Sequence, residues 1–318
     1  MKLRPVVLVF AVVLIFSEWA CQRGLKRDAP GGAVALVLKT LNNPYYVDME
    51  KGAQEAARTL GVELVVQAPE REIDVEKQMQ IVENLIQRRV AAICLAPCGS
   101  REIVPVIAKA NRQGIPVLIL DTRVDAKILR EAGGTVTTFI GSDNFEGGRI
   151  AGDFIVEALG GRGEVGILEG IPGHETSDER TRGFRTALGR SPGIRIVACQ
   201  TANWERDQGF NVFQNILQSH PQIQALFACN DLMALGAIEA IAAAGKTGKI
   251  RVVGFDFLAD GREAILRGAM EASVAQHPYD IGRLAIEHAH RAIKGEPIPA
   301  EIPVTVELIT REKIKAVR

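Results

Sequence analysis

Polar and aromatic residues stand directly after many of the short apolar runs of this 318-residue chain. The first run, 33–38, is followed by TLNNPYY (40–46), which holds two of the three tyrosines of the whole sequence. Later runs are followed by the polar residues Asp121, Asn230, Asp256 and Gln276. A further loop carries Trp204. Carboxylates and amides exchange hydrogen bonds with hydroxyl groups, and flat rings pack on C–H surfaces. These residue types together suit a polyhydroxylated ligand.

Each of these residues also has a purely structural explanation. Asn42, Asp143 and Asp231 precede expected helices, where Asn and Asp commonly cap the first turn. A tyrosine or tryptophan on a loop often covers the core rather than a ligand. The ligand interpretation therefore requires a fold that brings the strand ends together.

The apolar runs alternate with amphipathic stretches. The predicted strands are 33–38, 62–67, 91–95, 116–120, 136–140, 164–168, 194–199, 223–228, 250–254 and 271–275. The predicted helices are 47–60, 73–88, 102–113, 145–159, 178–189, 205–219, 231–244 and 279–294. The strands are continuously apolar, as expected of parallel strands that are buried on both faces. The alternation predicts an α/β protein with helices on both faces of its sheets.

Ten predicted strands are many for a single open sheet. We therefore expect two similar three-layer α/β/α lobes, each with a mostly parallel sheet of five or six strands. In such proteins the carboxyl ends of the strands face one cleft, where ligands bind. This arrangement would gather the polar strand ends into one site between the lobes.

The first 21 residues have the pattern of an export signal. Two basic residues precede an unbroken apolar run, 6–16, which is short for a membrane span. The run leads to Ala-Cys at Cys21, which resembles a bacterial lipoprotein site where the cysteine is lipidated. Glu18 stands where lipoproteins usually have leucine, so simple cleavage nearby and an uncleaved anchor remain alternatives. All three interpretations place the folded part outside the cytoplasmic membrane.

Composition and motifs argue against several other classes of protein. Lys+Arg and Asp+Glu number 38 each, and nucleic-acid binding usually needs a basic excess. Cys94, Cys98, Cys199 and Cys229 lack metal-ligand spacing; the last two are expected as buried thiols, with a disulfide between them as the alternative. The GxGxxG match at 161–166 precedes a strand instead of a helix, so it predicts no dinucleotide site. No catalytic group assembles, and we expect no enzyme, cofactor or metal.

Several motifs, in order over 33–310, resemble the periplasmic sugar-binding proteins of ABC importers, of the ribose-binding type. Repressors of the lac-repressor family share the same two-lobe core. The motifs are TLNNPYY (40–46), GSDNFEGGRIAGD (141–153), ERTRGF (179–184), FACNDLMALGAIEAI (227–241), VVGFD (252–256) and VAQHPYDIG (274–282).

The resemblance implies a set of ligand-binding residues. They are Asn43, Tyr45, Tyr46, Asp121, Arg180, Trp204, Asn230, Asp256 and Gln276. Tyr46 and Trp204 would enclose the ligand from its two faces. The ribose-type pattern has an arginine directly after Asp121, where this chain has Thr122. Arg123 comes one residue later and would point the other way in an extended segment. A different pentose, a hexose or a sugar alcohol is therefore as consistent with the sequence as ribose.

The resemblance also implies three crossovers between the lobes, near Ser142, Gln276 and Thr305. The first lobe would then comprise 32–142 plus 277–305, and the second 143–276 plus 306–318.

The function implied is that of an extracytoplasmic solute-binding protein. It would act as a monomer, held at the membrane by a lipid on Cys21, and deliver a monosaccharide or polyol to an ABC transporter permease. An accessory protein that presents sugar to a chemoreceptor or sensor kinase is the alternative. A repressor is disfavoured, since a signal-like peptide stands where a basic helix-turn-helix domain would be.

Overall fold

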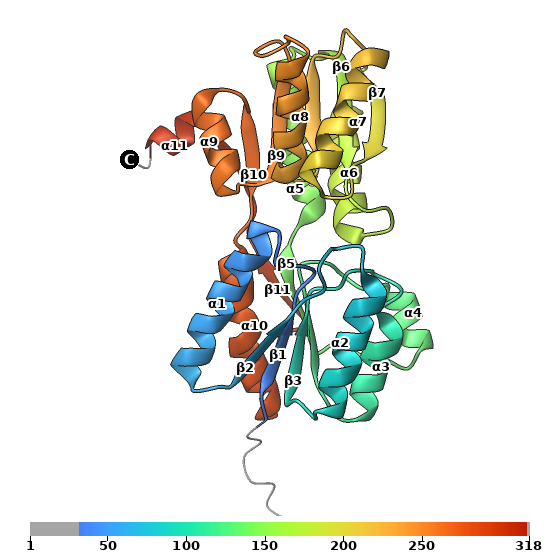
Figure 1. Cartoon of the computed structure of the whole chain (residues 1–318), viewed down its shortest axis with the longest axis vertical. Helices are drawn as coiled ribbons and strands as arrows, with labels where there is room; N and C mark the ends of the chain where they lie inside the picture. The colour runs from blue at the N-terminus through green and yellow to red at the C-terminus, as the bar shows by residue number, and fades with distance from the viewer. Residues whose placement is uncertain (1–31, 317–318) are drawn as a thin grey trace, which may run out of the picture. The chain divides into compact units, whose positions relative to one another are not determined.

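The computed structural model describes residues 32–316, so the predicted signal and Cys21 lie outside the described residues. Within this part of the chain, twelve strands form two sheets of six strands each (Figure 1). This confirms the predicted α/β class with two mostly parallel sheets. We call each sheet with the helices packed on it a lobe.

The first sheet has the strand order β11-β5-β4-β3-β1-β2, and all its pairs are parallel. Its strands are β1 (Val34–Val37), β2 (Leu64–Gln67), β3 (Ala92–Leu95), β4 (Val117–Leu120), β5 (Thr138–Ser142) and β11 (Glu301–Val304). Alternate residues of β1 enter two different cores: Leu36 packs with α1 and α10, whereas Val37 packs with α2 and α3. Figure 1 shows these two helix pairs on opposite sides of the sheet.

The second sheet has the order β12-β10-β9-β8-β6-β7, with β12 antiparallel to β10. Its strands are β6 (Arg162–Glu169), β7 (Gly193–Thr201), β8 (Ala225–Ala228), β9 (Arg251–Asp256), β10 (Ala272–Ala275) and β12 (Glu307–Thr310). All ten predicted strands are confirmed. The sequence analysis missed β11 and β12, whose partly exposed residues give no continuous apolar run.

Helices follow nearly every strand. They are α1 (Pro44–Leu60), α2 (Val75–Gln87), α3 (Val104–Arg112), α4 (Ala126–Glu131), α5 (Asn144–Ala158), α6 (Glu175–Leu188), α7 (Arg206–Ser219), α8 (Asp231–Ala243), α9 (Ala259–Arg267), α10 (Pro278–Ile293) and α11 (Arg311–Ala316). The eight predicted helices are confirmed, and the short helices α4, α9 and α11 were missed. The chain passes from one sheet to the other after β5, after β10 and after β11.

The start of α1 corrects the expectation that both adjacent tyrosines lie on a loop. Pro44 occupies the first helical turn, where its missing N–H costs nothing, and Tyr45 and Tyr46 are helical and buried. The cap is Asn43, whose side chain accepts a hydrogen bond from the Tyr45 N–H, so the expected cap at Asn42 is wrong.

Two further expectations about single residues have clear outcomes. Asp143 caps α5 as expected, but α8 is capped by Asn230 rather than by Asp231. Cys199 and Cys229 are both free thiols, so the alternative of a disulfide between them is wrong.

Glycines set the contact between paired helices. A Cβ on Gly52 of α1 would lie 1.9 Å from the Tyr279 carbonyl oxygen of α10, and one on Gly282 of α10 would lie 1.8 Å from the Met49 carbonyl oxygen of α1. In the second lobe, a Cβ on Gly148 of α5 would lie 2.0 Å from the Arg180 carbonyl oxygen of α6. Only glycine permits backbones to approach this closely. These contacts fix the helices that carry the tyrosine pair and Arg180.

Candidate functional site

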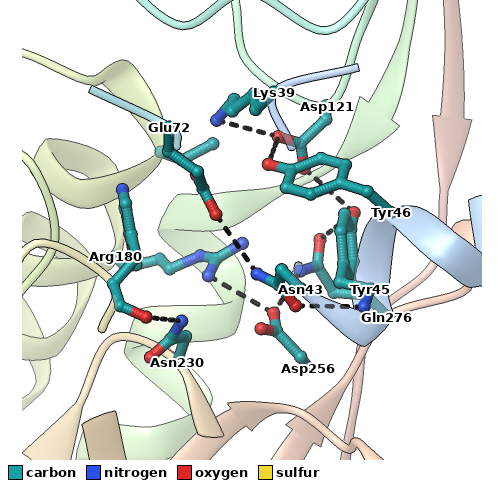
Figure 2. Close-up of a pocket in the computed structure, with 12 residues that line it drawn as sticks. Lys39, Asn43, Tyr45, Tyr46, Glu72, Asp121, Arg180, Asn230, Asp256 and Gln276 are labelled. Carbon is teal, nitrogen blue, oxygen red and sulfur yellow. Dashed lines mark hydrogen bonds and ion pairs between the residues drawn. The ribbon is translucent and has the colours of Figure 1, made fainter. Parts of the chain in front are cut away.

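One cavity is lined by residues from the ends of strands in both sheets (Figure 2). Its lining comprises Lys39, Asn43, Tyr45, Tyr46, Glu72, Asp121, Thr176, Arg180, Trp204, Asn230, Asp256 and Gln276. The cavity is narrow in this arrangement, with about 20 Å³ open to the centres of water molecules, which is room for about one ordered water. All nine residues predicted as ligand-binding lie in this lining, and their role there remains a prediction.

Three lining residues have strained backbones. Asp121, Trp204 and Asp256 adopt positive φ angles of 62°, 69° and 100°, a region that residues other than glycine seldom occupy. Asp256 is the last residue of β9, and Asp121 and Trp204 come shortly after β4 and β7, so the unusual φ turns each side chain where the chain leaves the sheet. Strain of this kind is often concentrated at functional sites.

Asp121 accepts hydrogen bonds from three side chains and forms an ion pair with a fourth. The Tyr45 hydroxyl donates to Oδ1 at 2.9 Å, and the Tyr46 and Thr122 hydroxyls donate to Oδ2 at 3.3 and 3.0 Å. The Lys39 ammonium lies 3.2 Å from the same Oδ2. Each carboxylate oxygen has about two lone-pair positions, so protein groups fill Oδ2, whereas Oδ1 has one protein donor and can accept another bond.

This arrangement compensates for burying a charge. Burial by itself raises the pKa of Asp121, but the positive charges of Lys39 and Arg180 and the hydroxyl bonds outweigh burial and hold the pKa below its usual range. Asp121 is therefore ionised at neutral pH, and it orients both tyrosine hydroxyls and the lysine.

Lys39 supplies the cation that the sequence analysis found missing beside Asp121. Its ammonium donates to the Thr122 hydroxyl at 2.7 Å, and its side chain is only 2% exposed. Arg123 points elsewhere, as expected, and forms an ion pair with Glu301 at 2.8 Å. Thr122, the residue after Asp121, thus accepts a hydrogen bond from Lys39, which follows β1.

Arg180 is fixed from the second lobe. Its Nε donates to Asn144 Oδ1 at 2.9 Å and its Nη1 donates to the Cys229 carbonyl at 2.7 Å. The guanidinium also lies 3.8 Å from the ring centroid of Phe255, a stacking distance. Within residues 32–316, Nη2 has no hydrogen-bond partner, which leaves it as a donor for the cavity.

Asp256 lies beside Arg180 in the cavity wall, and Figure 2 shows the two side chains pointing toward each other. Its Oδ1 lies 3.5 Å from Arg180 Nη1 and accepts from Gln276 Nε2 at 2.7 Å. Burial raises the pKa of Asp256 to about 7, with Arg180 and Gln276 offsetting part of the rise. Its Oδ2 has no partner among the described residues and offers an acceptor.

The two asparagines of the lining are partly committed to structure. Asn43 and Asn230 use their carbonyl oxygens as helix caps. Asn43 Nδ2 donates to Glu72 Oε1 at 3.2 Å, and Asn230 Nδ2 donates to the Trp204 carbonyl at 3.1 Å. Each amide retains one further N–H that could reach a ligand.

The sequence analysis missed Lys39, Glu72 and Thr176. Lys39 directly follows the first predicted strand, which was an available signal, but a lysine there is usually solvated. Glu72 lies in a loop and Thr176 in the first turn of α6, before the start predicted for this helix, and neither position carries a local signal. Thr176 is 2% exposed, and its hydroxyl has no partner within the described structure although it lines the cavity. A buried hydroxyl without a partner is costly, so its presence points to a ligand contact.

The lining offers both donors and acceptors without a large net charge. Two cations, Lys39 and Arg180, face the carboxyl groups of Glu72, Asp121 and Asp256. Burial raises the pKa of Glu72 as it does that of Asp256, so proton uptake brings the lining toward neutrality. An uncharged ligand that both donates and accepts hydrogen bonds fits this balance.

Two further features were not found in the part of the chain that the structure describes. Among residues 32–316, no three His, Cys, Asp or Glu side chains are grouped so that they could hold a metal ion. No helix in the same range is both long and apolar enough to span a bilayer.

Comparison with known proteins gives a consistent result. The family model of the periplasmic binding protein domain matches residues 34–297. The D-allose-binding periplasmic protein of Escherichia coli K12 is 40% identical over 84% of this chain and 86% of its own length. The ribose import binding protein of Haemophilus influenzae is 40% identical over 87% of this chain and 91% of its own.

A solved structure is similar over nearly its whole length. It is an ABC transporter periplasmic solute-binding protein from Actinobacillus succinogenes 130z with bound D-allose. The sequences are 39% identical, the TM-score is 0.85, and the match covers 90% of this chain and 99% of the other.

The buried pair of Lys39 and Asp121 can be tested by substitution. Asp121→Asn leaves the ammonium without a counter-ion and should lower the free energy of unfolding by about 3–5 kcal/mol. The double variant Lys39→Met with Asp121→Asn removes both charges and should lose less than the two single variants combined. Urea unfolding measures all three. Glu83→Gln, in an exposed pair with Lys109, is the control and should cost less than about 1 kcal/mol. Strict additivity of the Lys39 and Asp121 effects would contradict the pairing.

Proposed function

Because this chain belongs to the periplasmic binding protein family, we propose that it captures a monosaccharide or sugar alcohol and delivers it to the permease of an ABC transporter. The named relatives are binding proteins, and we propose that this chain likewise binds without catalysing a reaction. Binding takes place in the cavity between the two sheets.

The observation that carries this proposal is the set of unused polar atoms around a small, nearly neutral cavity. Arg180 Nη2 is a donor, Asp256 Oδ2 an acceptor and the Thr176 hydroxyl both. A sugar hydroxyl can donate and accept at once, so it matches mixed neighbours of this kind. The rings of Tyr45, Tyr46 and Trp204 add apolar surface for the C–H groups of the sugar.

The state of Asp121 narrows how the sugar is held. Its Oδ2 is occupied by protein groups, so in this arrangement the ligand meets Oδ1, the tyrosine oxygens and the Lys39 ammonium. Thr122 leaves no forked donor at this end of the cavity. We therefore propose a pocket for a monosaccharide or polyol of pentose to hexose size, without preference for ribose.

The two lobes give capture a mechanism. We propose that residues 32–142 plus 277–305 move against 143–276 plus 306–318 about the three connections near Ser142, Gln276 and Thr305. Closure brings the residues of both lobes onto the ligand, and a permease that recognises the closed form then receives the sugar.

A ligand panel tests the proposal directly. Calorimetry against D-allose, D-ribose, D-arabinose, D-tagatose and myo-inositol should reveal one compound that binds at least about a hundredfold more tightly than the weakest, since unpaired buried polar groups penalise wrong isomers. A phosphorylated hexose serves as the charged control and should not bind. A flat response across the panel would refute the proposal.

Thr176 allows binding to be separated from folding. Thr176→Val removes the unpartnered hydroxyl, so the melting temperature should stay the same or rise, whereas the Kd of the panel's tightest ligand should rise about tenfold. Thr181→Val changes a buried threonine of the same helix outside the cavity lining and should leave Kd unaltered. An unchanged Kd for Thr176→Val would mean that its hydroxyl does not meet the ligand.

We also propose that the protein is a monomer, anchored by a lipid on Cys21 and located in the periplasm. Cys21→Ser should move the protein from the membrane fraction to the soluble fraction and abolish labelling by a radioactive fatty acid. Cys199→Ser is the matched control and should leave both unchanged. Continued membrane association of Cys21→Ser would argue for an uncleaved anchor.

A further inference from the structure

His174 bridges the two lobes through both nitrogens of its ring. It lies in the loop between β6 and α6 and is only 3% exposed, but its side chain does not cap the helix. Its Nε2 lies 2.6 Å from the carbonyl oxygen of Cys98, in the loop after β3 of the first lobe. Its Nδ1 lies 3.4 Å from the indole Nε1 of Trp204, which lines the cavity.

The partners of His174 fix its tautomer. A backbone carbonyl can only accept, so Nε2 must carry the hydrogen in its bond to Cys98. An indole N–H can only donate, so Nδ1 must be the bare nitrogen that accepts from Trp204. The ring is therefore neutral in this conformation. A second proton on Nδ1 would face the Trp204 N–H and break that bond.

The Cys98 carbonyl, which accepts from His174, is held in place by the first lobe. Gln78, which is fully buried, donates to the carbonyls of Leu38 and Ala96 and accepts from the Cys98 N–H. The same loop receives a second bond from the other lobe, from the Glu175 N–H to Ser100 Oγ at 3.3 Å. The loop at 96–100 thus binds the start of α6 at two points, Cys98 and Ser100.

We propose that His174 is a positioning residue that latches the second lobe onto the first and, through the same ring, holds the Trp204 indole against the ligand. This inference rests on the proposed function, because the latch acts when the lobes close on a sugar. His174 would thus link the contact between the lobes to the position of Trp204 in the cavity wall.

The latch has a consequence for pH. Burial, together with the positive charge of Lys39, lowers the pKa of His174 to about 3, and the Cys98 carbonyl and the charge of Asp121 oppose this shift. When the lobes separate, the ring meets water and its pKa returns to about 6.5. Closure must then expel a proton below that pH. The contribution of the latch to affinity is therefore complete above pH 6.5 and lost progressively as the pH falls below it.

Other groups oppose this trend in the whole protein. The pKa values of Glu72, Asp256 and Glu175 are raised in the closed arrangement, chiefly by burial, so these groups take up protons when the lobes close. The pH dependence of Kd is therefore compared between the parent protein and a His174 variant. The contributions of the carboxyl groups are the same in both and cancel.

The test uses the full chain with Trp19→Phe, which leaves Trp204 as its single tryptophan. D-allose and D-ribose are titrated at pH 7.5 and 5.5, with Trp204 emission and calorimetry as readouts. His174→Gln retains one donor and one acceptor but does not titrate. The ratio of Kd at pH 5.5 to Kd at pH 7.5 should be about tenfold smaller in this variant than in its parent.

Two variants complete the experiment. Ser100→Ala removes the neighbouring bond between the lobes without touching His174, and it should keep the parental pH ratio. His174→Ala loses both bonds and should weaken binding about tenfold or more at both pH values, with altered Trp204 emission in the bound state. Melting temperatures confirm that each variant is folded. If a His174 variant is not folded, His174→Asn is used in its place.

The outcomes distinguish this inference from the proposed function. Sugar binding with the same pH ratio in the parent and in His174→Gln would overturn the latch alone. Absence of binding by both sugars at pH 7.5, in the parent as well as the variants, would count against the proposed function and the latch together.

Discussion

Two buried positive charges, Lys39 and Arg180, constrain the whole site, because an ion without water must be neutralised by its immediate neighbours. Lys39 is paired with Asp121 and held by Thr122, while Arg180 faces Asp256 and stacks on Phe255. Removing an ion from water costs several kcal/mol, which only well-placed partners offset. The cavity wall is therefore a set of mutually dependent groups, many of whose hydrogen bonds are made within the protein itself. Such preorganisation leaves little ordering cost to the binding event.

This network needs a scaffold that places groups from distant segments to within a hydrogen-bond length. The parallel strands of the two sheets bring such segments together, since parallel strands end at the same edge of a sheet. The glycine contacts between helices then hold these segments in place, because they lock α1 against α10 and α5 against α6 without intervening side chains. The positive φ angles of Asp121, Trp204 and Asp256 are the local cost of turning side chains into the cavity at the strand ends.

Each lobe contributes only part of the lining, so the complete site exists only while the lobes are in contact. Asp121 and the tyrosines come from the first lobe, whereas Arg180, Trp204 and Asp256 come from the second. A ligand that binds both sets stabilises the arrangement in which they meet, by the difference between its affinities for the two states. Direct contacts between the lobes, such as His174 to Cys98, belong to the same equilibrium, and in our proposal they affect affinity without touching the ligand.

The sequence by itself determined the layers and most of the cavity wall. Continuous apolar runs predict buried parallel strands, and polar residues at strand ends must meet when such strands share an edge. It did not reveal that Tyr45 and Tyr46 begin a helix. Pro44 can stand in a turn as well as in the first turn of a helix, and either Asn42 or Asn43 could have been the helix cap. β11 and β12 were missed since edge strands are too polar for a continuous apolar run. Only the tertiary structure decided which charges are buried and with what they pair. Lys39 meets Thr122 across 83 positions of sequence, and burial at that point depends on which distant elements pack together, a property that no local pattern of residues encodes.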